Sequence, residues 1–242
     1  MENNILYKYL DADGGLKMLQ NSNLQFSNAT KFNDPFDCHP SLIDCSKVPA
    51  YISEKFRSEI ISNFHSRFFR RARANAWICC LSKVYDALLM WSYYTNHKGI
   101  CIGLNIPKTK ECFSKSCRLS KKMEEIEVQY MDIIHKPDYF QDKINFYHYQ
   151  LGTKSKAWEH EQEVRLCIRE HCGGLQARHC NINLSHIHLD GECFVTIYLG
   201  VRIEEDSKNK IIDVAYRLNP DIEIYQMVVD ENAFRLTPKI IE

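Results

Sequence analysis

The sequence lacks any excess of charge and any long apolar run. It has 242 residues, of which 31 are Lys or Arg and 31 are Asp or Glu, so its formal net charge is zero. Proteins that bind duplex nucleic acid or anionic membranes broadly carry a positive field, so this balance argues against both as the main partner. No segment approaches the ~20 consecutive apolar residues that a membrane-spanning helix needs. We therefore expect no membrane partner.

A secretory signal and a glycine-rich phosphate loop are also missing. Residues 1–15 contain no basic region followed by an apolar stretch, which predicts a cytoplasmic protein. The pairs Gly14-Gly15 and Gly173-Gly174 have neither the spacing nor the strand–helix setting of a phosphate-binding loop. A nucleotide, if one binds, must therefore be held in another way.

The cysteines do not suggest a disulfide framework. Their number, eleven, is odd, and the chain is long enough to build a core without cross-links. Several lie inside apolar runs, where a free cysteine acts as a small apolar residue. We interpret these as reduced core thiols: Cys79, Cys80, Cys101, Cys167 and Cys193.

The histidines and cysteines do not form a recognisable zinc pattern either. Zinc ligands are usually separated by two or more residues. In the C-terminal half the candidate ligands are the adjacent pairs His171-Cys172 and His179-Cys180 and the alternating residues His186 and His188. The sequence therefore predicts no metal cofactor, and a hairpin loop is the better interpretation of 169–180.

Segments with strand and helix patterns are segregated along the chain more than they alternate. Apolar runs and period-two alternation predict strands at 24–28, 77–82, 99–105, 124–130, 163–169, 181–189, 194–200 and 221–229. Helical spacing predicts helices at 14–21, 51–73, 86–94, 137–160 and 205–218. This segregation favours an α+β fold with a mixed or antiparallel sheet and flanking helices. We treat residues 1–242 as a single domain.

The stretch "KAWEHEQEVRLCI", residues 156–168, concentrates three glutamates beside an arginine. If 161–169 is extended, Glu161, Glu163 and Arg165 share one face and the apolar residues between them pack on the other. One interpretation is an amphipathic strand whose acids form salt bridges. The other is a carboxylate at a cleft, where it would bond a sugar hydroxyl or stabilise an oxocarbenium-like transition state.

Two further stretches are open to a functional interpretation. "MWSYYTNHKGICIGL", residues 90–104, sets aromatic side chains with hydroxyls before a buried strand, which suits a flat base or nicotinamide ring, but also a core helix. "RFFRRARANAW", residues 67–77, is a local basic patch with aromatic neighbours that could serve phosphates and stacking. The zero net charge favours a solvated helix face for this second stretch.

Taken in order, these segments resemble the bacterial domain-of-unknown-function family 2971. The pieces "FNDPFD", "MWSYYTNHKG" and "WEHEQEVR" carry the resemblance, which spans roughly residues 5–203. The layout is similar to that of the ADP-ribosyltransferase-like superfamily. This resemblance implies a split β-sheet core and an enzyme that uses NAD as a substrate, as an ADP-ribosyltransferase or an NAD glycohydrolase.

The resemblance also implies roles for individual residues. Glu163 would be the catalytic carboxylate on the nicotinamide ribose, and Glu161 would orient or deprotonate the acceptor. The NAD-binding residues would be Tyr7, Lys8 and Tyr9 of the first motif and Trp91, Ser92, Tyr93 and Tyr94 of the second, with Lys8 or Arg165 facing the diphosphate. The first motif has neither the His nor the Arg that is usual there.

The partners that follow are a nucleotide or small-molecule substrate and a protein or nucleic-acid acceptor. The alternative hypothesis is a non-catalytic module that binds a nucleotide or a protein in a bacterial defence or stress system. The sequence does not predict an oligomeric state.

Overall fold

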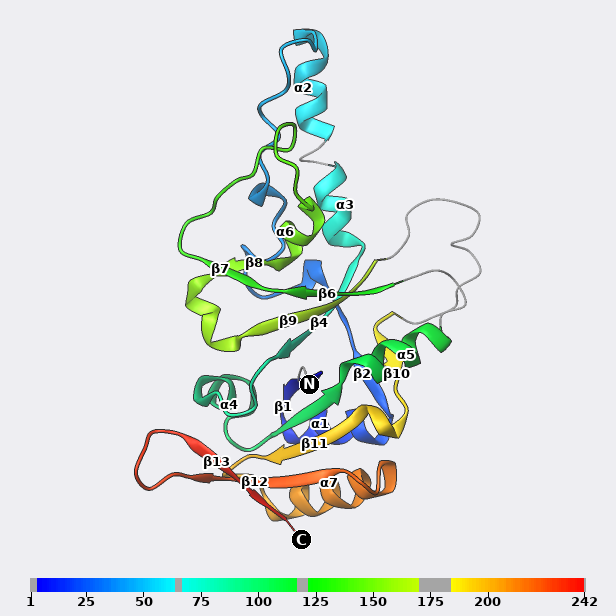
Figure 1. Ribbon diagram of the computed structural model, residues 1–242, viewed down its shortest axis with the longest axis vertical. Coiled ribbons are helices and arrows are strands. Elements are labelled where there is room, and N and C mark those ends of the chain that lie inside the picture. Colours follow the sequence, from blue (N-terminus) through cyan, green and yellow to red (C-terminus); the bar gives the residue numbers. More distant parts are fainter. Residues whose placement is uncertain (1–3, 64–66, 117–121, 170–183, 242) are drawn as a thin grey trace.

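A nine-stranded mixed sheet runs through the computed structural model, which describes residues 4–63, 67–116, 122–169 and 184–241 (Figure 1). The strand order is β13-β12-β11-β5-β1-β4-β9-β6, with β3 paired to β4 beside this row. Pairing is antiparallel except between β11 and β12. The strands are β1 (Ile5–Leu10), β3 (Ser27–Asn28), β4 (Ala76–Ser82), β5 (Ile100–Asn105), β6 (Met123–Glu127), β9 (Glu163–Arg169), β11 (Phe194–Leu199), β12 (Glu223–Val229) and β13 (Leu236–Ile240).

Helices and two small two-stranded sheets flank the main sheet. The small sheets pair β2 (Asn23–Gln25) with β10 (His186–His188) and β7 (Gln129–Met131) with β8 (Thr153–Ser155). The α-helices are α1 (Ala12–Gln20), α2 (Glu54–Asn63), α3 (Phe69–Ala74), α4 (Leu88–Thr95), α5 (Ile106–Ser116), α6 (Phe146–Gly152) and α7 (Glu205–Leu218). Short 3-10 turns include η1 (Ala29–Lys31), η2 (Pro40–Leu42), η4 (Lys156–Glu161) and η6 (Gly191–Cys193).

The main sheet divides between β1 and β4. β1 pairs with β5 along its whole length, but it meets β4 only at Tyr7↔Ser82. Beyond this pair the two strands diverge, so that β4, β9 and β6 lie above β5, β11 and β12 in Figure 1. We call this divergence the fork of the sheet.

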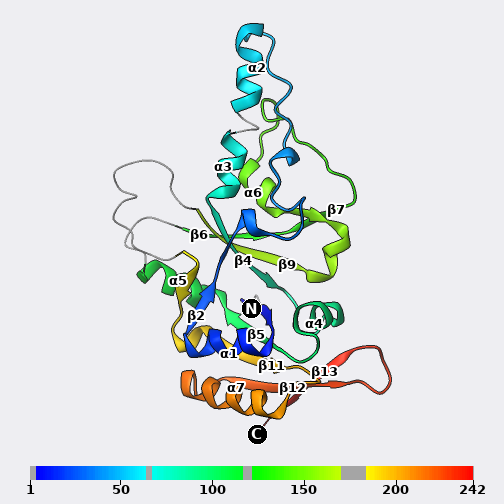
Figure 2. The same cartoon turned by 180° about the vertical axis from the view of Figure 1, so that it is seen from behind.

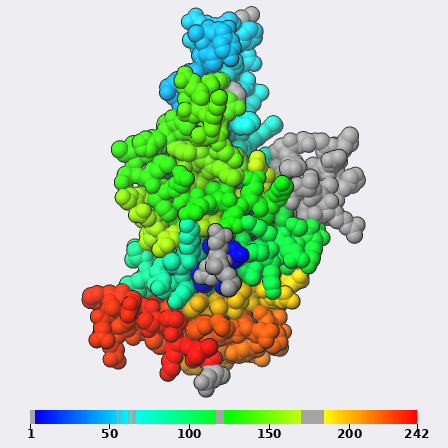
Figure 3. Space-filling model, viewed as in Figure 1, coloured from blue at the N-terminus to red at the C-terminus, as the bar shows by residue number. Residues whose placement is uncertain are grey.

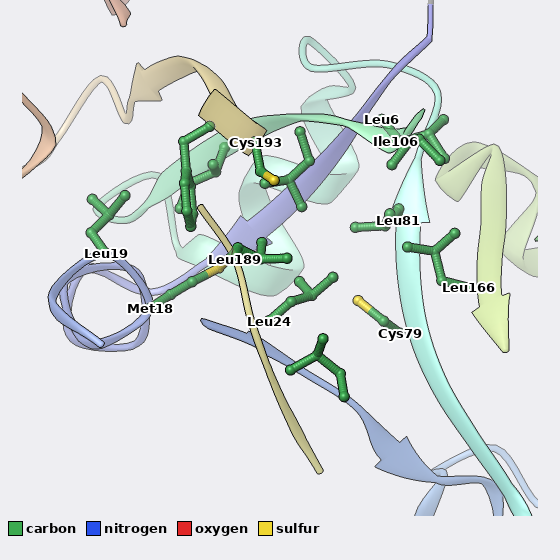
Figure 4. Close-up of a cluster of buried hydrophobic side chains, with 14 of the residues drawn as sticks. Leu6, Met18, Leu19, Leu24, Cys79, Leu81, Ile106, Leu166, Leu189 and Cys193 are labelled. Atoms are coloured by element: carbon green, nitrogen blue, oxygen red, sulfur yellow. The ribbon is translucent and has the colours of Figure 1, made fainter. Parts of the chain in front are cut away.

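The largest apolar cluster covers one face of both halves. Leu6 of β1, Cys79 and Leu81 of β4 and Leu166 of β9 meet side chains of α1 and β2 there (Figure 4). Val164 and Ile168 belong to the same cluster, which confirms the prediction that the apolar residues of β9 pack together on one face. Glu163 and Arg165 lie on the opposite face because successive side chains of a strand alternate.

The molecule is elongated, and its two ends differ. α2 lies at one end of the long axis, whereas α7 packs on the lower half of the sheet at the other end (Figures 1 and 2). The space-filling view shows a narrow upper end around α2 and a broad base formed by the C-terminal strands and α7 (Figure 3). Among the described residues, no helix combines the length and the apolar character needed to cross a bilayer.

Most of the predicted elements are confirmed. The α+β class, the mixed sheet, the strands at 77–82, 99–105 and 163–169 and the helix at 205–218 all occur in the structure. The cysteines that we interpret as core thiols are free, and all are buried except Cys80, which is partly exposed. β13 was not predicted.

The long helix predicted at 137–160 is wrong. Helix α6 begins only at Phe146, where the Asn145 side chain accepts a hydrogen bond from the His148 amide. Before it, the backbone of Asp138 bridges to Asp44, and the Asp138 carboxylate accepts from the Phe140 amide. Such local side-chain bonds compete with helical ones and explain why the helix begins late.

Two other helix predictions need correction. The segment 51–73 holds two helices, α2 and α3, and its residues 64–66 lie outside the described part of the chain. Phe56 and Phe68, two of the apolar residues whose four-residue spacing predicts this helix, are 53% and 54% exposed. Helix α4 begins at Leu88 and not near Asp86, and Ala87 precedes it without a side-chain cap.

Candidate functional site

The acidic stretch bends where a continuous strand is predicted. Glu161 is the last residue of η4, Gln162 adopts a left-handed conformation with φ 43°, and β9 begins at Glu163. The prediction that 161–169 is extended throughout is therefore wrong at its first two residues. The bend nevertheless brings the carboxylates of Glu161 and Glu163 to the same neighbour, Lys154.

Lys154 joins the two glutamates. Its ammonium forms an ion pair with Oε2 of Glu161 and another, 2.9 Å long, with Oε2 of Glu163. The Lys154 side chain is 9% exposed, and Glu161 and Glu163 are 4% and 2% exposed. The expectation that these side chains point outward is therefore wrong, but the salt bridges of the first interpretation are confirmed for Glu163, which pairs with Arg165.

Arg165 continues this set of charges into the interior. Its Nε donates to Oε1 of Glu163 at 2.8 Å, and its two Nη atoms donate to the two carboxylate oxygens of Asp37 at 2.8 and 2.9 Å. The Leu151 carbonyl accepts a further bond from Nη1 at 2.7 Å. Arg165 has no exposed surface. We refer to Asp37, Lys154, Glu161, Glu163 and Arg165 as the charge network.

Burial makes the charge network costly unless its members stay paired. Burial alone would raise the pKa of Glu163, but the Arg165 guanidinium and the Lys154 ammonium outweigh it and hold the pKa below its usual range. Burial would likewise lower the pKa of Lys154, but the Glu163 and Glu161 carboxylates outweigh it and raise the pKa. Both side chains are therefore charged at neutral pH.

Two tyrosines complete the surroundings of the network. The Glu163 amide donates to the Tyr130 hydroxyl at 2.8 Å, and burial raises the pKa of Tyr130 to about 12. The Tyr94 hydroxyl donates to Oε1 of Glu161 at 2.6 Å, and burial together with this bond raises the pKa of Tyr94. Unlike the buried members of the charge network, Tyr94 is 44% exposed.

Tyr94 is exposed toward a cleft of about 500 Å³ at the fork of the sheet. Its walls come from β1, α1, β2, β4, α4 and β10, and they include Lys8, Cys80, Phe32 and His186. The Lys8 ammonium donates to the Cys80 carbonyl across the fork at 2.9 Å. The Phe32 ring lies against the Arg165 guanidinium, 5.4 Å from Cζ to the ring centroid. Phe32 and Tyr94 thus lie between this fork cleft and the charge network.

A second, smaller cavity touches the charge network from another side. It measures about 180 Å³ and is lined by Asp37 and Lys154 together with Phe36 and Met131. The network therefore borders this smaller cavity directly, whereas Phe32 and Tyr94 separate it from the larger fork cleft.

The structure brings together one residue from each of the three predicted motifs. Lys8 and Tyr94 line the fork cleft, and Glu161 is bonded to Tyr94. Glu163 and Arg165 lie deeper, in the charge network.

The other predicted residues lie elsewhere. Tyr7, Tyr9 and Trp91 pack in an apolar cluster, and Tyr9, although it also contributes to the cleft wall, donates its hydroxyl to the Val84 carbonyl. Trp91 is fully buried and donates to the Tyr85 carbonyl. Ser92 and Tyr93 are exposed; neither is among the residues that line the fork cleft.

Sequence reasoning missed three residues of the site: Asp37, Lys154 and Tyr130. Asp37 ends the "FNDPFD" piece, which enters the sequence analysis only as part of the family resemblance. Arg165 stands between apolar residues of a strand, and a buried arginine needs an acidic partner. That need was the feature of the sequence from which an acid such as Asp37 could have been sought. Lys154 had a weaker signal, as a lysine shortly before a cluster of acids.

The histidines and cysteines at 171–180 lie outside the described residues, so the structure does not bear on them. In the part of the chain that it describes, no group of three or more His, Cys, Asp or Glu side chains is arranged to hold a metal ion. His186 and His188 are both exposed on β10, as their alternation predicts.

One family model matches the chain, that of a protein of unknown function, DUF2971, over residues 90–166. The chain is thus similar to this family from α4 to the middle of β9, which supports the resemblance found in the sequence. The matched region contains Tyr94 and four members of the charge network: Lys154, Glu161, Glu163 and Arg165. No curated protein and no solved structure gives a match.

Proposed function

We propose that the chain breaks the nicotinamide–ribose bond of NAD in the fork cleft, as an ADP-ribosyltransferase or an NAD glycohydrolase. The observation that carries the proposal is the 2.6 Å hydrogen bond from Tyr94 to Glu161 at the wall of this cleft. The bond joins the second and third predicted motifs, and Lys8 of the first motif lines the same cleft.

The fork cleft has the size and the chemistry for such a ligand. Its volume of about 500 Å³ lies within the range of ~300–1,000 Å³ that is typical of ligand pockets. The rings of Phe32 and Tyr94 offer flat surfaces for nicotinamide or adenine. The Lys8 ammonium is a compact cation suited to a diphosphate.

We assign the stabilisation of the ribose to Glu161. Both oxygens of Glu163 accept bonds from Arg165 or Lys154 within the charge network. Those of Glu161 accept bonds from Lys154 and from Tyr94, and Tyr94 is a half-exposed residue that lines the cleft. As the bond from C1′ of the ribose to the nicotinamide nitrogen breaks, positive charge develops on the ribose, and a nearby carboxylate stabilises it. Nicotinamide leaves with the bonding electrons, and water or an acceptor bonds to C1′ and loses a proton. Glu163 would then position Lys154 and, through it, Glu161.

Release of nicotinamide from NAD, separated chromatographically, tests this proposal. We expect release by the wild-type chain and a loss of at least ~100-fold in Glu161→Gln, since removal of one group that stabilises transition-state charge costs about that much. The matched control is Glu159→Gln, because Glu159 lies on the same 3-10 turn but is exposed. Equal activity of Glu161→Gln and wild type would overturn the assignment of Glu161.

One observation favours a second function, that of a non-catalytic module which binds a nucleotide or a protein. The carboxylate oxygens of both glutamates already have bonding partners within the chain. Such a module would be stabilised by its ligand by RT ln(1 + [L]/Kd) without consuming it. A rise in melting temperature with NAD, with no nicotinamide formed in a long incubation, would support this second function over the first.

A further inference from the structure

A hollow of about 630 Å³ is lined by residues of η1, η2 and α3. Arg70 and Arg73 of α3 line it together with Thr30 of η1 and with His39 and Ser41 around η2. Among the described residues, no acidic residue lines it, and none of its lining residues lines the fork cleft. The hollow is therefore separate from the fork cleft, and its lining includes two arginines.

Neither arginine of this hollow forms an ion pair with an acid in the part of the chain that the structure describes. Nε of Arg73 donates to the Ala29 carbonyl at 3.3 Å, which holds this side chain against η1. The Arg70 side chain is exposed. Guanidinium groups without a carboxylate partner can donate to an anion without first breaking a salt bridge.

His39 adds a neutral donor to the same wall. Nδ1 of His39 accepts a hydrogen bond from the Ser41 amide at 3.1 Å, and an amide nitrogen can only donate. The proton of the neutral ring must therefore sit on Nε2, which makes Nε2 a donor. Burial, followed by the charges of Arg73, Arg70 and Lys136, lowers the pKa of His39 and so favours this neutral ring.

We propose that the hollow binds the phosphate group of a nucleotide or of a single-stranded nucleic acid. Arginine donors match the geometry of phosphate oxygens, and charge-assisted bonds of this kind are about twice as strong as neutral ones. The volume of the hollow exceeds that of a phosphate group, so a sugar or a base fits beside it. The proposal does not depend on the function proposed for the fork cleft.

Binding measurements with three probes test the proposal: inorganic pyrophosphate, AMP and a fluorescein-labelled single-stranded RNA 12-mer. We expect Arg70→Gln to weaken binding of at least one probe about tenfold, the effect of losing one charge-assisted hydrogen bond. Arg71→Gln is the matched control, because Arg71 is exposed on the same helix but does not line the hollow. Arg70→Lys, which keeps the charge, should bind with intermediate affinity.

The pattern across the probes identifies the source of the phosphate. Binding of pyrophosphate or AMP supports a small nucleotide ligand, whereas binding of the RNA alone, with a steep salt dependence, supports a nucleic acid. Equal weakening by Arg71→Gln and Arg70→Gln would overturn the proposal, because it would indicate a diffuse positive surface. Failure of all three probes to bind would overturn it as well. Melting temperatures of the variants, which we expect to be unchanged, ensure that a loss of binding is not a loss of fold.

Discussion

The Arg165 guanidinium binds the Asp37 carboxylate in parallel, with Nη1 to Oδ1 at 2.8 Å and Nη2 to Oδ2 at 2.9 Å. The two residues are 128 positions apart in the sequence and both are buried. A bidentate salt bridge of this kind fixes the relative orientation of the two side chains as well as their distance. It therefore attaches the segment that contains "FNDPFD" to the strand that begins at Glu163, and holds Phe32 of that segment at the fork cleft.

Removal of the Glu163 charge should destabilise the fold. Glu163→Gln leaves Arg165 and Lys154 each with one buried partner fewer, and the breaking of a buried ion pair costs about 3 kcal/mol. Urea unfolding at neutral pH measures this loss. The control is Glu125→Gln, which removes a partly exposed salt bridge to Lys110 and should cost less than ~1 kcal/mol. If the two variants were equally stable, the charge network would contribute nothing beyond a surface pair.

The contribution of Glu163 should also depend on pH. Because Arg165 and Lys154 outweigh burial, the pKa of Glu163 is lowered in the folded chain from the ordinary value of 4.5 to which it returns on unfolding. The unfolded chain therefore takes up the proton first as the pH falls, and stability is lost in that direction. We expect the stability difference between wild type and Glu163→Gln to be constant near neutral pH and to shrink below about pH 4.5. A difference that grew on acidification would contradict this sign.

Tyr94 should affect function more than stability. Tyr94→Phe removes the hydrogen bond to Glu161 from a half-exposed ring, so we expect a loss of about 1 kcal/mol in stability. If the proposed function holds, nicotinamide release should fall about tenfold, because Glu161 loses the group that orients it. Tyr93→Phe, at the neighbouring 66% exposed tyrosine outside the cleft, should change neither quantity. Equal effects of both variants on nicotinamide release would show that the Tyr94–Glu161 bond has no special role.

Gly103 allows close packing of β5 against β11. A Cβ at this position would lie 2.2 Å from Oγ1 of Thr196, a short and buried side chain with little room to move. Gly103→Ala should therefore destabilise the fold by about 2 kcal/mol through overpacking. Gly14→Ala is the comparison, because the added Cβ would first meet the Asp11 carboxylate, at 3.0 Å on an exposed and flexible side chain. Thermal unfolding of both variants, with a smaller effect at Gly14, is the expected result.

The sequence was most informative where local pattern and burial agree. The strands at 77–82 and 163–169 and helix 205–218 show clear apolar periodicity, and the structure contains all three. The prediction failed at 137–160, where helical composition is overridden by the side-chain bonds of Asp138 and by its bridge to Asp44. It failed at 51–73 because regular spacing of apolar residues does not guarantee that they are buried.

For the candidate site, the residue types could be predicted from the sequence, but the burial of their side chains could not. Glu161, Glu163 and Arg165 were singled out as a group, yet their alternation suggested a solvated face. Whether such a face is covered depends partly on distant segments, here the one that contains Asp37, 128 positions from Arg165, and short-range pattern carries no information about them. The left-handed turn at Gln162 was equally invisible, because glutamine has no preference for that conformation.

The single β1–β4 pair at the fork has a mechanical consequence. Strands joined by a ladder stay ~4.8 Å apart, but here a lysine side chain, Lys8, makes the next bond across the gap, to the Cys80 carbonyl. At this point the two half-sheets are joined by the flexible Lys8 side chain and not by backbone hydrogen bonds, so their separation is not fixed by the ladder spacing. The Lys8 ammonium has three donors and this carbonyl takes one of them, so the same side chain that spans the fork can also donate to an anion in the cleft.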